Sequence, residues 1–120
     1  MKQTYIASSD DERFECEFEI DRDIFPPPEE LRKIINVNTS SMNDGQVFDL
    51  MIRYIAREVF CYYIQGYYLE EVMDLIAEID GLIAIDGRFG IELKNCYGNQ
   101  IDAENITVHI KNGDWYGYRL

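Results

Sequence analysis

The strongest constraint on the fold is an unbroken alternation of charged and apolar residues from Arg13 to Asp21. The apolar positions are Phe14, Cys16, Phe18 and Ile20, and the charged positions are Arg13, Glu15, Glu17, Glu19 and Asp21. A period of two places these sets on opposite faces of a β-strand, predicted from Arg13 to Ile20. Such a strand belongs to an antiparallel sheet with one face on a core and the other in water. Gln3–Ala7 is predicted to pair with it as a hairpin, across the polar loop Ser8–Glu12.

A triple proline, Pro26–Pro28, ends this strand, because proline cannot donate a hydrogen bond to a ladder. Pro28 suits the first position of a helix, where the missing N–H has no partner in any case. Glu29 and Glu30 then stand in the first turn, where negative charge is favourable. These signals predict a short helix from Pro28 to about Val37.

Two further helices are predicted from apolar residues at helical spacing. The longer one runs from about Gln46 to Gln65. Asn43 and Gln46 have the spacing of a capping box, and Gly66 suits the left-handed position after a helix. The C-terminal part of this helix is apolar almost all round, which indicates either a central core helix or one partly covered by a partner. The other helix, Leu69–Asp80, separates its apolar residues from its acids and is amphipathic.

Two hairpins are predicted after the helices, each at a dipeptide that favours a two-residue type I′ turn. The first joins Leu82–Ile85 to Arg88–Lys94 through Asp86-Gly87. The second joins Ile106–Lys111 to Asp114–Tyr118 through Asn112-Gly113. The order of two strands, three helices and about four strands predicts an α+β fold, with about three helices on one face of an antiparallel sheet. We expect a single domain over residues 1–120.

The chain is strongly acidic, with 23 Asp and Glu residues against 11 Lys and Arg residues and a formal net charge of −12. This charge repels phosphate backbones and anionic membranes, so direct binding to nucleic acid or to a membrane is not expected. It attracts basic protein surfaces instead. The acids are concentrated around the alternating strand: ten lie between Asp10 and Glu30, against only Arg13 and Arg22.

The acids of the alternating strand are the first candidate for a partner-binding site. Residues on one face of a strand lie about 6.6–6.8 Å apart, a scale similar to the through-space spacing of phosphates along one nucleic-acid strand. This face and the turn after it could therefore imitate DNA toward a basic partner, through Glu15, Glu17, Glu19, Asp21 and Asp23. The alternative interpretation is the solvated face of an edge strand that uses charge to prevent aggregation.

A tyrosine cluster is the second candidate for partner binding. Four tyrosines surround Gly66 between the two longer helices: Tyr62, Tyr63, Tyr67 and Tyr68. They encircle a helix end, so they cannot all point inward, and tyrosine is enriched at protein interfaces. The alternative interpretation is a corner of the core whose hydroxyl groups reach solvent.

The cysteines and the absence of a leader pattern indicate a cytoplasmic protein. Cys16, Cys61 and Cys96 are odd in number and lack CxxC spacing, which is typical of buried free thiols in a reducing compartment. The sequence has no run of eighteen apolar residues and no basic segment followed by an apolar one. Neither a signal peptide nor a membrane span is therefore expected.

The sequence predicts no metal, no cofactor and no catalytic site. Asp21-Arg22-Asp23 begins like a calcium loop, but Phe25, Pro26 and Arg32 occupy positions that need the oxygen ligands and the glycine. His109 is the only histidine, and its predicted place in a strand opposite Tyr116 indicates a structural role. No glycine-rich phosphate loop and no motif of a hydrolase or metalloprotease is present.

Three segments carry a resemblance to known proteins: Phe18–Asp23, Pro28–Leu31 and Gly81–Leu93. Over about Arg13 to Ile110, the chain resembles a small family of phage- and prophage-encoded proteins of unassigned function. The resemblance brings no catalytic residues and implies a setting, in which small acidic phage proteins neutralise bacterial defence complexes.

Together these patterns predict a non-enzymatic acidic binding protein of phage or mobile-element origin. It would inhibit a basic, nucleic-acid-binding host complex such as a CRISPR or restriction system, either by DNA mimicry or by simple occlusion. The alternative is a structural or homo-oligomeric module, such as a homodimer, whose acidic surface only provides solubility.

Overall fold

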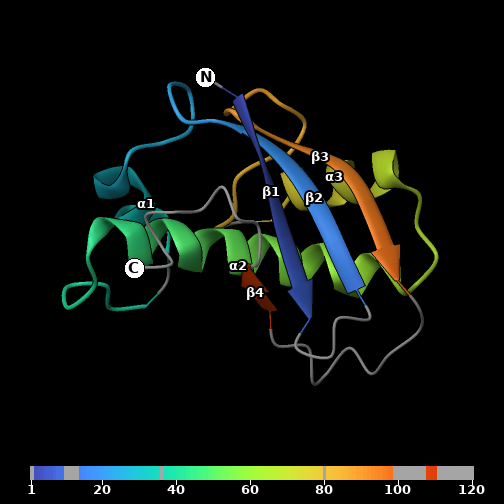
Figure 1. The fold of residues 1–120 in the computed structure, drawn as a ribbon, viewed down its shortest axis with the longest axis horizontal. Coiled ribbons are helices and arrows are strands. Elements are labelled where there is room, and N and C mark those ends of the chain that lie inside the picture. Colours follow the sequence, from blue (N-terminus) through green and yellow to red (C-terminus); the bar gives the residue numbers. More distant parts are fainter. Residues whose placement is uncertain (1, 10–13, 36, 80, 99–107, 111–120) are drawn as a thin grey trace.

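The computed structural model describes residues 2–9, 14–35, 37–79, 81–98 and 108–110. In these residues the order of elements is β1 (Lys2–Ser9), β2 (Phe14–Asp21), α1 (Pro28–Ile34), α2 (Asp44–Tyr63), α3 (Leu69–Ala77), β3 (Ile91–Gly98) and β4 (Val108–Ile110). The strands form an antiparallel sheet in the order β3-β2-β1-β4 (Figure 1). The predicted α+β class is confirmed.

Strands β1 and β2 pair antiparallel, with Tyr5 opposite Phe18 and Ala7 opposite Cys16. All eight positions of β2 alternate between buried and half-buried, as the sequence pattern predicts. The buried set faces the helices and forms the centre of the core with Tyr5 and Ala7. Ser8 and Ser9 of the predicted loop Ser8–Glu12 belong to β1 instead, because the ladder with β2 extends to the pair Ser8–Glu15, and residues 10–12 lie outside the described residues.

Helix α2 is the central helix of the core and packs against β1, β2 and β4 (Figure 1). Asn43 and Gln46 form the predicted capping box, with each side chain accepting a hydrogen bond from the other residue's backbone N–H. The helix ends at Tyr63, and Gly66 has φ of 95°, in the left-handed region that favours glycine. Phe48 of α2 contacts the ring of Tyr5, with centroids 5.9 Å apart, so helix and sheet interlock through aromatic side chains.

The two shorter helices pack around α2. Helix α1 contacts α2, and α3 contacts both α2 and β3. Both end three residues before the predicted boundaries at Val37 and Asp80, because helix α1 gives way to extended backbone at Ile35 and helix α3 to a turn at Glu78.

The first predicted C-terminal hairpin is wrong in its first strand and in its turn. Leu82–Ile85 forms no strand, and β3 begins only at Ile91 and pairs along its length with β2. The chain still folds back beside the start of β3, where Asp86 forms an isolated bridge with Glu92. The reversal needs positive φ at two positions, Gly87 and Gly90, and is longer than a two-residue turn.

Tertiary contact at Gly90 explains this difference. The Gly90 carbonyl accepts a 2.7 Å hydrogen bond from the backbone N–H of Asp21, which ties the turn to the end of β2. A Cβ atom at position 90 would lie 2.5 Å from the backbone nitrogen of Phe25. The turn is therefore shaped by the segment after β2, which local sequence signals do not report.

The second predicted C-terminal hairpin lies largely outside the described residues. Its turn at Asn112-Gly113 and its strand Asp114–Tyr118 are in this part of the chain. What is described is β4, which pairs antiparallel with β1 so that His109 is opposite Ser8.

Candidate protein-binding face

The strand that carries the acids lies inside the sheet. β2 is hydrogen-bonded to β1 on one side and to β3 on the other, so the interpretation of an edge strand is wrong. Charge on an edge strand prevents pairing with other chains because the edge leaves N–H and C=O groups unpaired. On an interior strand these groups are already paired with both neighbours, so β2 does not need charge for this purpose. The acids of β2 therefore call for a different explanation.

We name the four acids of β2 the acidic strip: Glu15, Glu17, Glu19 and Asp21. All four are half-buried and lie on the face of the sheet that points away from the core, because they alternate with the buried set. Their cross-strand neighbours on β1 are Ser8, Ile6, Thr4 and Lys2, respectively. This surface is the outer face of the sheet.

Like charges stand directly opposite each other on the outer face. Glu19 of β2 is paired in register with Glu92 of β3, an arrangement that destabilises a sheet. Two lysines offset part of this repulsion: Lys2 Nζ lies 3.5 Å from Glu19 Oε1, and Lys94 Nζ lies 3.5 Å from Glu92 Oε1. Exposed pairs of this kind contribute only about 0–1 kcal/mol each. Among the described residues, five acids of β2 and β3 thus meet two lysines, and the face stays negative.

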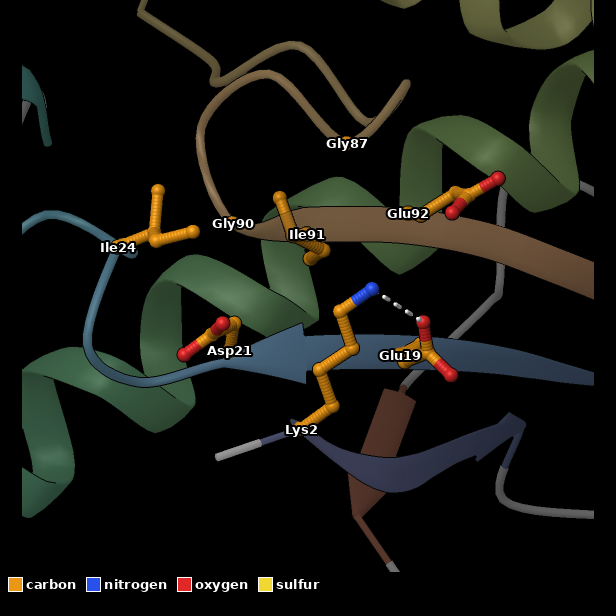
Figure 2. A pocket seen from close by; sticks show the side chains of 8 residues that line it. All are labelled: Lys2, Glu19, Asp21, Ile24, Gly87, Gly90, Ile91 and Glu92. Atoms are coloured by element: carbon orange, nitrogen blue, oxygen red, sulfur yellow. Dashed lines mark ion pairs between the residues drawn. The ribbon is translucent and has the colours of Figure 1, made fainter.

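A small hollow of about 110 Å³ lies at the Asp21 end of the acidic strip (Figure 2). Figure 2 shows Lys2 extending toward Glu19, with Asp21 and Glu92 to either side. Its lining is Lys2, Glu19, Asp21, Ile24, Gly87, Gly90, Ile91 and Glu92. The backbone N–H of Asp23 donates to Asp21 Oδ1 at 3.0 Å, which holds the pKa of Asp21 below its ordinary value. Asp21 is therefore charged throughout the neutral range, and Asp23 is exposed beside it.

Tyr97 belongs to the same face and was missed by sequence reasoning. It is 54% exposed and lies opposite Glu15 in the β2–β3 register. Strict alternation from Leu93 would place it on the buried face, but the register shifts between Glu17 and Phe18, and Lys94 is the extra residue on β3. The signal that could have found Tyr97 is the break in alternation at Lys94.

The tyrosine cluster divides between the core and the surface. Tyr63 packs edge-on against Phe14, with ring centroids 5.9 Å apart, as expected for a corner of the core. Tyr62 packs edge-on against Tyr67 at 5.9 Å, and Tyr68 is 76% exposed. Phe14 points inward and Glu15 outward, so the cluster and the acidic strip lie on opposite sides of the sheet. The structure does not join the two predicted binding sites into one surface.

Metal-binding and reactive groups give no competing site in the described part of the chain. No group of three or more His, Cys, Asp or Glu residues there is arranged to hold a metal ion. Burial raises the pKa of all three thiols, that of Cys96 to about 12, whereas a reactive thiolate requires a lowered pKa. In the same residues, no helix has both the length and the apolar character needed to cross a membrane.

Comparison with protein-family models, with curated protein sequences and with solved structures gives no match to this chain. The resemblance to phage proteins stays a prediction.

Proposed function

We propose that this chain is a non-enzymatic binding protein whose outer sheet face occupies a basic, nucleic-acid-binding surface of another protein. The observation that supports this function is the acidic strip on an interior strand, with Glu92 opposite Glu19. Sheet pairing is made by backbone groups and the core by the inner-face side chains, so neither depends on this concentration of acids, and Glu19 directly opposite Glu92 opposes folding. A like-charge pair that weakens the fold is characteristic of a functional surface.

The chemistry of the outer face fits a partner that normally binds a phosphate backbone. Same-face acids about 6.6–6.8 Å apart present regularly spaced negative charge, and the net charge of −12 steers the chain toward a basic surface. Tyr97 adds an exposed aromatic side chain beside Glu15, of the kind that supplies buried contact at interfaces. The chain would thus exclude nucleic acid from the partner by occupying the same surface.

The setting we propose is a bacterial cell infected by a phage or carrying a mobile element. The partner would be a defence complex that binds nucleic acid, such as a CRISPR or restriction system. This setting follows from the resemblance described above and from the acidic charge.

Affinity capture with a charge-matched control tests the proposal. The immobilised chain is incubated with nuclease-treated bacterial lysate, beside a strip variant (Glu15→Gln, Glu17→Gln, Glu19→Gln) and a control variant that loses three exposed acids at α3 (Glu70→Gln, Asp74→Asn, Glu78→Gln). The proteins retained are identified by mass spectrometry. We expect the parent and the control variant to retain the same basic, nucleic-acid-binding proteins, and double-stranded DNA to displace them. The strip variant should lose them.

Retention of the same proteins by the strip variant, or failure of DNA to compete, would overturn the proposal. Capture of only the chain itself would favour the homo-oligomeric module instead.

A further inference from the structure

Two of the three cysteines lie opposite each other in the sheet. Cys16 of β2 and Cys96 of β3 are directly paired in register, and both contribute to the core side of the sheet. Both are free thiols, as is Cys61 on α2. The sequence places Cys16 and Cys96 eighty residues apart, so only the sheet topology brings them together.

The spacing of the pair suits a disulfide. Residues directly opposite in an antiparallel pair have Cα atoms about 4.5–5.5 Å apart. A disulfide spans Cα separations of about 4.4–6.8 Å. No change of register between β2 and β3 is therefore needed to join the two sulfur atoms.

Access to the pair is through β3. Cys16 is fully buried, whereas Cys96 is half-buried and lies two residues after the bulge at Lys94. A bulge interrupts the ladder, and strand ends beyond such a point open more readily than a continuous strand. Burial raises the pKa of both thiols, so in the closed sheet they react slowly. We therefore expect the two thiols to react when the Lys94–Gly98 segment opens.

We infer that Cys16 and Cys96 form a redox-sensitive clamp, in which a low-molecular-weight disulfide such as glutathione disulfide oxidises the two thiols to a cross-strand disulfide. Cys96 loses its proton to solvent, and its sulfur attacks one sulfur of glutathione disulfide, releasing one glutathione. The sulfur of Cys16, also deprotonated, then attacks the Cys96 sulfur and releases the second glutathione. Two electrons pass from the protein thiols to the reagent, and two glutathione molecules result. The clamp would lock β3 to the strand that carries the acidic strip, and it stands independently of the proposed function.

Equilibration of the full-length chain with glutathione disulfide tests the clamp. The equilibrium is approached from two starting states, the reduced folded chain and the chain oxidised in urea and then refolded. Agreement between the two shows that slow kinetics do not mask the equilibrium. Free thiols are then alkylated in denaturant and mapped by mass spectrometry, with Cys61→Ser and Cys96→Ser variants alongside.

We expect one alkylated cysteine per parent chain, Cys61, and a disulfide-linked peptide pair containing Cys16 and Cys96. The melting temperature should rise by about 10 °C on oxidation, since the link closes most of the chain into a loop. Cys61→Ser should behave like the parent, and Cys96→Ser should show no rise. Three alkylated cysteines from both directions, a stable glutathione adduct on Cys96 with Cys16 still free, or a link that involves Cys61 would each overturn the inference.

Discussion

The two faces of β2 have opposite relations to the fold. On the inner face Phe14, Cys16, Phe18 and Ile20 are buried against the helices, and every one contributes to the core. On the outer face Glu15, Glu17, Glu19 and Asp21 are half-buried, and Glu19 opposes another acid. Both faces share one backbone and one set of ladder hydrogen bonds. The inner face is explained by stability alone, whereas Glu19 opposite Glu92 on the outer face does not stabilise the sheet, and we propose that this face serves a partner.

A substitution on the inner face should have the largest effect on folding. Phe18→Ala removes a fully buried ring at the centre of β2 and should lower the free energy of unfolding by about 3–5 kcal/mol, because it leaves a cavity. Urea denaturation measures the loss. Its matched control on the outer face is Glu17→Gln, which should change stability by less than about 0.5 kcal/mol. Equal losses for the two variants would contradict the division between the faces.

A substitution at Gly90 should have the next largest effect. Gly90→Ala places a Cβ atom 2.5 Å from the backbone nitrogen of Phe25, at φ of 87°, and should cost about 2 kcal/mol or more. Gly66→Ala is the control, because its φ of 95° is equally strained but no atom lies within 4 Å of the added carbon. It should cost about 1 kcal/mol, so the difference between the variants measures the close contact alone. Equal losses would show that the turn is not held against the segment after β2.

The smallest effect concerns protonation of two aspartates. Asp21 on the outer face should titrate below the ordinary aspartate pKa of about 3.9, because the Asp23 backbone N–H donates to its carboxylate. Asp49 on α2 should titrate above the ordinary aspartate pKa, because burial disfavours its charge. Arg53 opposes this shift, with its Nε 2.6 Å from Asp49 Oδ2. NMR titration of the carboxyl carbons measures both values.

The two shifts have opposite consequences for stability. The folded pKa of Asp21 is lowered, so its contribution is present above about pH 4 and is lost as the pH falls through the folded pKa. The folded pKa of Asp49 is raised, so its contribution is present at low pH and is lost as the pH rises through its folded value. Asp21→Asn should flatten the fall in stability between about pH 5 and pH 3 relative to the parent. An unchanged slope would show that Asp21 carries no interaction specific to the folded chain.

Local patterns predicted the elements, and long-range pairing decided how they meet. The alternation of β2, the capping box at Asn43 and the left-handed Gly66 each depend on residues close in sequence, and each was found from them. The position of β2 inside the sheet was not, because it requires pairing with β3, whose residues lie 71 to 84 positions further along the chain. The turn at Gly90 was missed for the same reason. The bulge at Lys94 is marked in the sequence by a break in alternation, but its position in the register, and the exposure of Tyr97 that follows from it, require the pairing with β2.

The sequence predicted the residues that β2 contributes to the candidate site, but not those that β3 contributes. The acids of the strip were identified from alternation alone, whereas their neighbour Glu92 and the aromatic Tyr97 come from β3 and required the register. The tyrosine cluster was the second candidate, with a corner of the core as its alternative, and Tyr63 fits that alternative because it packs against Phe14 on the core side of the sheet.

Whether the outer face binds the partner is tested by the affinity of a captured basic partner for the parent chain and for the strip variant, measured across salt concentrations. We expect Glu15→Gln, Glu17→Gln and Glu19→Gln together to weaken binding by about tenfold or more at low salt, mainly through slower association. The difference should shrink as salt screens exposed charge. The α3 control variant should bind like the parent throughout. Equal affinity of the strip variant and the parent at low salt would show that the acidic strip does not bind the partner, and would favour the tyrosine cluster as the binding site.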